Sequence, residues 1–198
     1  MKQLKSLTLF GLLLTFLGCQ APKELKTGEG FIEVKGGKIW YKVVGHGDKR
    51  PLVMLHGGPG YPSYYFNPLL LELSKERQVI VFDQLGCWRS DRISDTTLMT
   101  VENYVEQTRQ LLNELNIKDY YLLGHSWGTM LGVDYYLKYS DGIKGLILGS
   151  PCLSSKMWVK DADALISTLP DSIQAVLRNN IKGVNQDSAK LNKAIKFY

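Results

Sequence analysis

The sequence predicts an α/β protein in which helices cover both faces of a mostly parallel, doubly wound β-sheet. Several short segments are apolar throughout rather than in alternation, which is typical of strands buried on both faces. These segments alternate with stretches of helical periodicity, and this alternation favours parallel strand pairing. The 198 residues, of which 44% are hydrophobic, are enough to form one substantial core.

Residues 1–18 are predicted to be a signal peptide. A basic start, MKQLK, precedes the apolar run SLTLFGLLLTFLG, which is too short for a comfortable membrane span. The run ends at Gly18-Cys19, and a small residue before a cysteine resembles the lipobox of bacterial lipoproteins. We therefore expect lipidation at Cys19 and an exported protein, anchored to the membrane on its periplasmic or cell-surface side. An uncleaved anchor and an ordinary secretory signal are the alternatives.

Three segments follow the signal peptide. Residues 19–30 are polar with glycines and are expected to form a tether. Residues 31–151 carry the alternating strands and helices and are predicted to form the α/β core. Residues 152–198 contain no further strand-like run, and their patterns predict only short helices.

Within the core segment, each element is predicted from its local pattern. Two strands flank Gly36-Gly37, where a tight hairpin turn is favoured. The apolar spacing of TVENYVEQTRQLLNELN predicts an amphipathic helix, which Thr100 caps and in which Glu102 suits the helix dipole. The other predicted elements are, in chain order, a strand at 51–55, a helix in YYFNPLLLEL, strands at 78–83 and 119–124, a helix at 127–139 and a strand at 142–149.

The composition argues against several kinds of binding. The formal charge is +5, but the lysines are scattered and no basic stripe is interleaved with aromatic residues, so nucleic-acid binding is not expected. Cys87 and Cys152 have no metal-ligand spacing, and the chain has neither a C-x-x-C motif nor a histidine pair at helical spacing. We therefore expect no metal and no cofactor, while the oligomeric state is left open.

The stretch YLLGHSWGTML carries the strongest chemical signal. Residues 124–128, GHSWG, have the form G-x-S-x-G between a predicted strand and a predicted helix. That context is typical of a tight strand-to-helix turn, in which the glycines avoid clashes and the serine hydroxyl is raised above the sheet edge. Ser126 is therefore the candidate nucleophile. A serine in a tight turn with no chemical role is the alternative.

A second glycine-rich segment, HGGPG at residues 56–60, follows a predicted strand and suits an oxyanion hole. A tetrahedral intermediate needs two backbone N–H donors, one of which comes from the residue after the nucleophile, Trp127. We expect the second donor to be Gly58, with Gly57 as the other candidate. His56 is expected to support this loop through hydrogen bonds rather than to act as the base.

A serine nucleophile also needs a base, and the chain has three histidines. His125 adjoins Ser126 in the sequence, so its side chain is expected to point away from the serine hydroxyl. His46 lies at the end of an early hairpin, before any catalytic loop. Since His56 is expected to support the oxyanion loop, none of the three is placed to serve Ser126.

Three motifs occur in a characteristic order: HGGPG, then DQLGCWRS at residues 83–90, then GHSWGTML. Together they resemble the proline iminopeptidases of the α/β-hydrolase fold, and in particular the branch that includes the tricorn-interacting aminopeptidases. The resemblance covers roughly residues 31–198, with 152–198 as the beginning of the family's helical cap domain. Trp88 departs from the family pattern D-Q-x-G-x-G-x-S, which usually has glycine at this position.

The resemblance implies a serine aminopeptidase that acts on small peptides without a cofactor: Ser126 attacks the first peptide carbonyl and releases the N-terminal residue, often proline. In the family, an aspartate and a histidine on later loops complete the triad, and cap glutamates bind the substrate's amino group. This chain has no glutamate after Glu114 and no histidine after His125. We therefore expect an N-terminal fragment that is inactive alone. The later aspartates that are expected to be helix caps and surface charges are Asp161, Asp163, Asp171 and Asp187.

Two other functions remain open. The same fold serves esterases, whereas an epoxide hydrolase or a dehalogenase would normally carry aspartate in place of Ser126. Alternatively, the chain is complete and is a non-catalytic, membrane-tethered binding protein. An open sheet edge with exposed apolar surface would argue against the non-catalytic binding protein, because it would indicate an incomplete fold.

Overall fold

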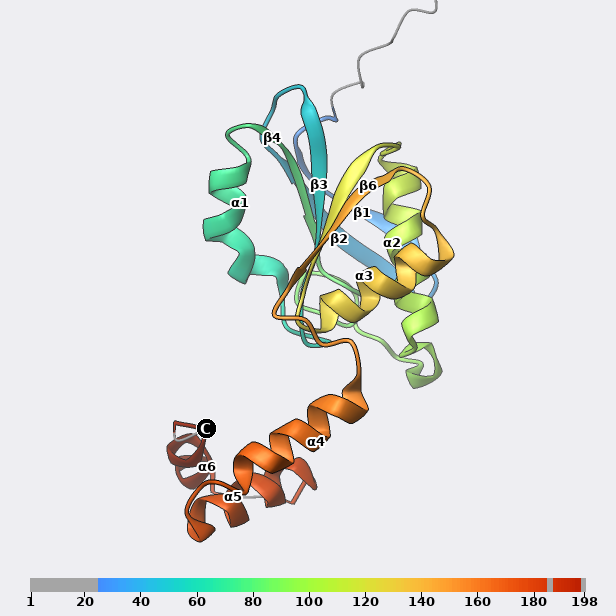
Figure 1. Ribbon diagram of the computed structural model, residues 1–198. Helices are drawn as coiled ribbons and strands as arrows, with labels where there is room; N and C mark the ends of the chain where they lie inside the picture. The colour runs from blue at the N-terminus through green and yellow to red at the C-terminus, as the bar shows by residue number, and fades with distance from the viewer. Residues whose placement is uncertain (1–24, 185–186, 197–198) are drawn as a thin grey trace, which may run out of the picture.

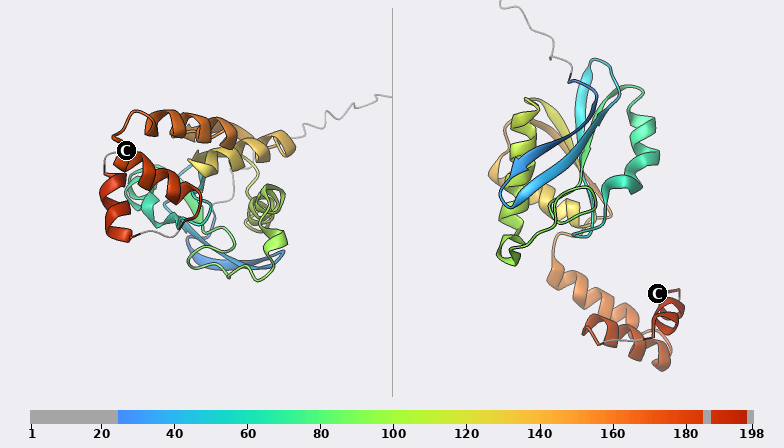
Figure 2. Two further views of the ribbon diagram at one scale, coloured as in Figure 1. Left: turned by 90° about the horizontal axis from the view of Figure 1, so that it is seen from below. Right: turned by 180° about the vertical axis from the view of Figure 1, so that it is seen from behind.

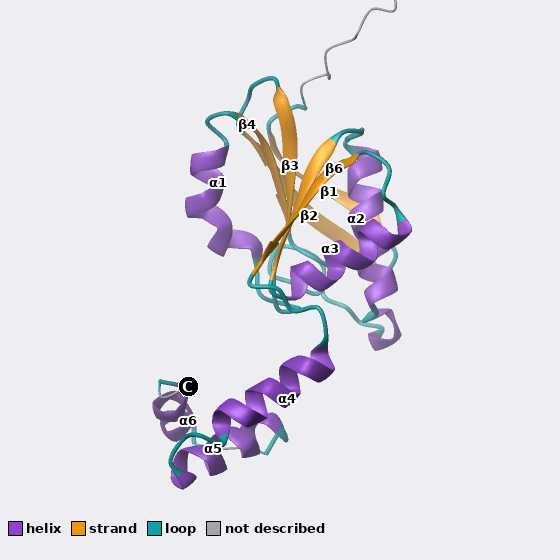
Figure 3. Ribbon diagram, in the orientation of Figure 1, coloured by secondary structure: helices purple, strands orange, loops and turns teal. Residues whose placement is uncertain are grey.

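The computed structural model describes residues 25–184 and 187–196, which form a six-stranded β-sheet with flanking helices and a further group of helices beyond it (Figures 1 and 3). The predicted signal peptide and the Cys19 lipidation site lie outside these residues. The first strand begins at Gly28, which falls within the segment 19–30 that was expected to be a tether. Among the described residues, no helix combines the length and the apolar character needed to cross a membrane.

The sheet has the strand order β1-β2-β4-β3-β5-β6. β1 and β2 form an antiparallel hairpin and β2 pairs antiparallel with β4, whereas β4, β3, β5 and β6 run parallel to one another. The predicted mostly parallel α/β sheet is therefore confirmed. The strands are β1 (Gly28–Val34), β2 (Gly37–Val44), β3 (Lys49–Leu55), β4 (Arg77–Phe82), β5 (Tyr120–His125) and β6 (Ile143–Gly149).

Helix α1 covers one face of the sheet, and α2 and α3 cover the other (Figure 1). Each strand and helix predicted within the core segment is present, with its ends shifted by a few residues. The stretch YYFNPLLLEL forms a short 3-10 helix that continues into α1. The helices are η1 (Ser63–Phe66), α1 (Asn67–Leu73), η2 (Thr96–Leu98), α2 (Val101–Glu114), α3 (Trp127–Lys138), α4 (Ser155–Ile166), α5 (Asp171–Ile181) and α6 (Ser188–Ile195).

Strand β3 shows why the central strands are apolar throughout. Leu52 and Met54 pack on the α1 side of the sheet, while Val53 and Leu55 pack on the side of α2 and α3. All four side chains are at most 3% exposed. Successive side chains of a strand point to opposite faces, so a strand covered on both faces needs an apolar residue at every position.

Helix α2 begins as its sequence predicts. The Thr100 hydroxyl accepts a hydrogen bond from the Asn103 amide at 3.2 Å, and Glu102 lies in the first turn. Both features stabilise the start of a helix, where backbone N–H groups lack partners within the helix. The face that includes Tyr104 and Leu111 is buried against the sheet.

Helices α4 to α6 form a group of their own at the edge where the parallel strands end, joined to the sheet by the segment after β6 (Figures 1 and 2). Their small core consists of Ile166, Leu177 and Ala194. As predicted for the later aspartates, Asp187 caps α6 by accepting a hydrogen bond from the Ala189 amide at 2.8 Å. The other three serve as charges: Asp171 lies in the first turn of α5, Asp163 pairs with Arg178, and Asp161 is exposed.

Apolar side chains are exposed on both sides of this connection. In β6, which pairs with β5 alone among the described strands, Ile147 is 45% exposed and Leu148 is 36% exposed. In α4, Met157, Trp158 and Leu165 are each more than half exposed. The edge strand and the first helix after it therefore both present apolar surface to solvent.

Candidate active site

Ser126 occupies the turn between β5 and α3. Its backbone has φ 52° and ψ −121°, a region that non-glycine residues rarely adopt and that costs conformational energy. The turn is held by a hydrogen bond of 3.0 Å from the Ser126 amide to the Gly149 carbonyl on β6. A strained serine between a strand and a helix is the geometry of a nucleophile mount.

The two glycines of the G-x-S-x-G motif are required by backbone packing. A Cβ atom added to Gly124 would collide with the Gly128 carbonyl oxygen. A Cβ atom added to Gly128 would collide with the Leu55 carbonyl oxygen. The start of α3 is therefore packed directly against the end of β3, and only glycine permits this approach.

Trp127 is the first residue of α3, so its backbone N–H points from a helix N-terminus, where partial positive charge favours an oxyanion. Its indole is anchored separately. The Nε1 atom donates a hydrogen bond of 3.0 Å to Oε1 of Gln84, and the ring packs edge-on against Tyr104. These side-chain contacts fix the first turn of α3.

His56 is fully buried, and both of its ring nitrogens have partners. Nδ1 lies 2.9 Å from the Gly57 carbonyl oxygen, and Nε2 accepts a hydrogen bond of 2.9 Å from the Gln84 amide. Burial lowers the pKa of His56, so the ring is neutral at neutral pH. Support of the oxyanion loop stays a prediction for His56, and these contacts favour it over a role as base.

Gln84 connects the HGGPG loop to the start of α3, and this position was not predicted from the sequence. Its side-chain amide donates to the His56 carbonyl at 3.1 Å and accepts from the Trp127 indole at 3.0 Å. Only the motif DQLGCWRS pointed to this residue. Its neighbour Asp83 is also buried and accepts hydrogen bonds from the amides of Ser63 and Arg89.

The HGGPG loop, the candidate oxyanion loop, lies against Ser126. A Cβ atom added to Gly57 would be 3.2 Å from Cβ of Ser126. The Gly57 amide, however, donates a hydrogen bond of 2.8 Å to the Tyr65 hydroxyl, so it is already used. Gly58, which is exposed and has φ 119°, stays the candidate for the second oxyanion donor.

His125 contacts residues of η1, and these contacts favour the predicted direction of its side chain, away from the serine hydroxyl. Its Nδ1 atom lies 2.9 Å from the Tyr65 hydroxyl, and its ring packs near the rings of Tyr65 and Phe66. Among the described residues, no imidazole is hydrogen-bonded to the Ser126 hydroxyl.

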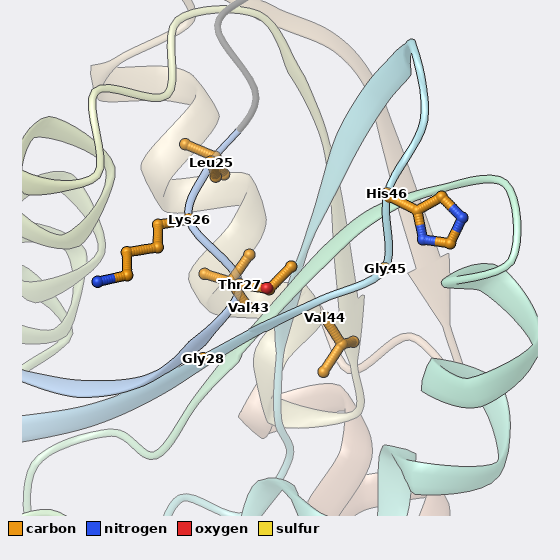
Figure 4. Close-up of a pocket in the computed structure, with 8 residues that line it drawn as sticks. All are labelled: Leu25, Lys26, Thr27, Gly28, Val43, Val44, Gly45 and His46. Atoms are coloured by element: carbon orange, nitrogen blue, oxygen red, sulfur yellow. The ribbon is translucent and has the colours of Figure 1, made fainter.

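The third histidine, His46, lies at the other end of the sheet. It is exposed and lines a shallow hollow beside the start of β1 (Figure 4). Because it precedes β3, it lies near the beginnings of the parallel strands, whereas Ser126 lies at their carboxyl ends. His46 is therefore not part of the candidate site.

One buried group of side chains has the residue types of a metal site. Ligand atoms of His56, Asp83 and Cys87 lie within 4.8 Å of one another. Both ring nitrogens of His56 already have partners, and the Asp83 carboxylate accepts two backbone amides. Burial raises the pKa of Cys87 to about 11, so its sulfur is a neutral thiol at neutral pH. These contacts do not fit a bound metal ion.

Comparison with known proteins identifies the family. Residues 50–194 match the family model described as alpha/beta hydrolase fold. The chain belongs to the α/β-hydrolase family. The fold class predicted for it is confirmed, and the strand-to-helix turn at Ser126 is typical of an α/β-hydrolase core.

Proline iminopeptidases are among the relatives of this α/β-hydrolase. The chain is 39% identical over 171 residues to the proline iminopeptidase of Heyndrickxia coagulans, covering 86% of this chain and 59% of that protein. It is 35% identical over 177 residues to the one of Clostridioides difficile strain 630, covering 88% and 60%. The resemblance drawn from the three motifs is therefore confirmed. The chain spans about three fifths of the length of these relatives.

Solved structures, one of them a proline iminopeptidase, have a similar fold. The crystal structure of VinJ has a TM-score of 0.77 and 29% sequence identity, over 85% of this chain and 59% of that chain. The crystal structure of the Mycobacterium smegmatis proline iminopeptidase has a TM-score of 0.71 and 25% identity, over 84% of this chain and 58% of that chain. This α/β-hydrolase thus shares the fold of a solved proline iminopeptidase across most of its own length.

Proposed function

We propose that this α/β-hydrolase supplies the nucleophile and the oxyanion hole of a serine aminopeptidase, which releases N-terminal residues, often proline, from small peptides. The observation that carries the proposal is the strained turn at Ser126 with the oxyanion loop packed against it. Backbone strain of this kind is typical of functional sites, and a serine held in such a turn is typical of a catalytic nucleophile. The named activity of the relatives supports the choice of substrate.

In the proposed reaction, the Ser126 hydroxyl attacks the carbonyl carbon of the first peptide bond and loses its proton to a base. The backbone N–H groups of Trp127 and Gly58 stabilise the oxygen of the tetrahedral intermediate. Collapse of that intermediate breaks the peptide bond, and the base returns the proton to the leaving amine. Water then hydrolyses the acyl-enzyme and frees the N-terminal residue.

The proposal requires a base that none of the three histidines supplies. The nitrogens of His56 are occupied, His125 faces Tyr65, and His46 is exposed at the far end of the sheet. We propose that none of these three histidines is the triad base. The triad histidine, the triad aspartate and the group that binds the substrate's amino terminus would all be supplied by other residues of the protein. Removal of a triad base lowers kcat by about 10⁴ to 10⁶-fold, so the 198-residue chain alone is expected to be nearly inactive.

The test compares turnover of proline p-nitroanilide with that of p-nitrophenyl acetate by the protein expressed from its whole reading frame. Faster turnover of the anilide, lost in Ser126→Ala, supports the aminopeptidase. Turnover of the ester alone would favour the esterase. Sequencing the nucleotides after codon 198 shows whether the frame continues to a late aspartate and histidine. A 198-residue chain as active as an intact aminopeptidase would contradict the proposal.

We also propose that the protein is exported and anchored to the membrane through lipid at Cys19. The basic and apolar start of the chain and the Gly18-Cys19 junction support this location. A single acyl chain gives only marginal membrane binding, so stable anchoring would depend on several chains at this cysteine.

A further inference from the structure

Trp88 adopts a backbone conformation that is unusual for a large residue. Its φ is 32°, while its side chain is 47% exposed. A tryptophan at such a position gains only part of the stabilisation that full burial gives, because nearly half of its surface stays in water. Strain at a non-glycine residue near a reactive site is a reason to look for a functional contact.

Two tyrosines extend the exposed aromatic surface around Trp88. Tyr64 packs against Trp88 in an edge-to-face arrangement with ring centroids 5.5 Å apart, and Tyr61 follows with its ring 6.3 Å from Tyr64. Tyr61 is 54% exposed and Tyr64 is 47% exposed. We call these three residues the aromatic rim. Exposed aromatic side chains that gather in one place are typical of a binding surface, whereas scattered ones are not.

The aromatic rim is continuous with the candidate active site. Tyr61 lies 5.5 Å, centroid to centroid, from Tyr65, whose hydroxyl accepts a hydrogen bond from the Gly57 amide. Gly57 in turn lies against Ser126. The rim is thus separated from the nucleophile by the oxyanion loop, so it would contact parts of a peptide beyond the residues that flank the scissile bond.

One charged residue, Arg89, contacts the rim and is already paired. The Arg89 guanidinium lies 4.3 Å from the ring centroids of both Trp88 and Trp40, and it forms an ion pair with Glu29 at 3.4 Å. These contacts pack the Arg89 side chain against the Trp88 indole and pair its charge with Glu29. A surface of this kind offers apolar ring systems a large contact area with favourable edge and face geometry.

Proline and aromatic side chains are the ligands that such a surface recognises. Proline-rich peptides dock on grooves lined with tyrosine and tryptophan, because their extended backbone is already ordered and their rings pack flat on aromatic faces. We propose that the aromatic rim of Tyr61, Tyr64 and Trp88 binds proline or aromatic side chains on the leaving side of the peptide substrate. This proposal rests on the proposed aminopeptidase function. It adds a preference of the enzyme for certain substrate residues on the C-terminal side of the hydrolysed bond.

The test measures binding without turnover. The protein expressed from its whole reading frame, with Ser126→Ala, is titrated with the tripeptides Pro-Phe-Phe and Pro-Gly-Gly, and Kd is measured by calorimetry. This protein is expected to bind Pro-Phe-Phe about fivefold more tightly, since aromatic pairs contribute about 0.5–1.5 kcal/mol each. Trp88→Gly and Tyr64→Ala should each reduce the ratio of the two Kd values, Pro-Gly-Gly over Pro-Phe-Phe, toward one. Trp88→Phe should retain most of this ratio.

Trp158→Ala is the matched control, because Trp158 is also about half exposed, at 57%, but lies on α4 outside the rim. It should leave the ratio unchanged. Glycine suits the backbone at position 88, so Trp88→Gly is expected to fold, and circular dichroism checks this for each variant. An unchanged ratio in both rim variants, or no binding of either peptide, overturns the rim proposal. If rim variants alter binding as expected, but the protein expressed from its whole reading frame with Ser126 intact does not hydrolyse proline p-nitroanilide, the aminopeptidase proposal is contradicted and the rim proposal stays supported.

Discussion

The Tyr65 hydroxyl lies 2.9 Å from Nδ1 of His125, and this contact joins the oxyanion loop to the residue before the nucleophile. The same hydroxyl accepts the Gly57 amide at 2.8 Å, so its own proton is directed to the histidine. Burial raises the pKa of Tyr65, which keeps the phenol protonated and able to donate this bond at neutral pH. One side chain from η1 therefore sets the position of the loop and the ring orientation of His125.

Replacement of Tyr65 by phenylalanine should loosen the oxyanion loop. The buried Gly57 amide would lose its acceptor, and a buried unpaired amide costs about 1–3 kcal/mol. We expect hydrogen exchange of the Gly57 amide to be about tenfold faster in Tyr65→Phe, as measured by NMR. Tyr136→Phe, on the exposed face of α3, is the control. Equal exchange in the two variants would show that Tyr65 does not hold the loop.

Replacement of Ser126 by glycine should stabilise the fold while removing the nucleophile. Glycine tolerates the backbone conformation at φ 52°, and relief of such strain contributes about 1 kcal/mol or more. Urea unfolding of Ser126→Gly should show this gain. Ser126→Ala, which removes the hydroxyl but keeps the strain, should show none. A gain of the same size in both variants would mean that the hydroxyl, and not the backbone, carries the cost.

Replacement of Gly124 by alanine should be strongly destabilising. The added methyl group would collide with the backbone of Gly128, which cannot move without displacing α3 from β3. We expect a loss of at least about 2 kcal/mol in the free energy of unfolding. Gly149→Ala on the adjacent strand is the control, because its nearest neighbour would lie at 3.6 Å. The packing argument fails if urea denaturation gives the two variants the same stability.

Burial of neutral His56 should make the fold sensitive to mild acid. The folded pKa is lowered relative to the ordinary value of 6.5, so the unfolded chain binds the proton more strongly and stability falls as the pH drops below 6.5. Between the folded and unfolded pKa values, the free energy of unfolding should fall by up to about 1.4 kcal/mol for each pH unit. Carboxylates with lowered pKa values, such as Glu29 and Asp119, add their effects only below pH 4.5.

Stability curves between pH 5 and pH 7 check this prediction. His56→Gln should be less stable at neutral pH but should lack the slope in this range. His46→Gln, at an exposed position, should keep the slope of the parent protein. A parent protein whose stability is constant from pH 7 to pH 5 would rule out the buried neutral histidine as an acid-sensitive group.

Lipid attachment at Cys19 predicts a simple cellular result. Bacteria grown with labelled palmitate should incorporate the label into the parent protein and into Cys152→Ala, and both should sediment with membranes. Cys19→Ala should lose the label, because the thiol that receives lipid is gone. Labelling that persists in Cys19→Ala would contradict this site.

The sequence predicts local structure well where one signal lies within a few residues. Thr100 and the apolar spacing after it define α2 almost to its ends, and GHSWG defines the serine turn. The alternation of strands and helices gives the sheet type. Strand order is not predicted in this way, since the pairing of β2 with β4 depends on contacts between distant segments.

The supports of the candidate site were harder to predict. Tyr65 and His125 are 60 positions apart, and Gln84 and Trp127 are 43 positions apart. Both hydrogen bonds form only because three loops meet at the carboxyl ends of parallel strands, which is a property of the folded sheet. Tyr65 also lies in a stretch whose local pattern indicates only a helix. Gln84, in contrast, stands in the motif DQLGCWRS, so the sequence carries a signal for it that it does not carry for Tyr65.

The outer edge of β6 has a consequence for handling the purified chain. Its backbone N–H and C=O groups form a ladder beside the exposed Ile147 and Leu148, and a second copy can extend such a ladder. Lys144 is the one charged residue on this strand. Self-association should therefore be second order in protein concentration and should accelerate as the monomer is concentrated. Unfolding and titration experiments on this chain are best performed in dilute solution, with light scattering recorded alongside.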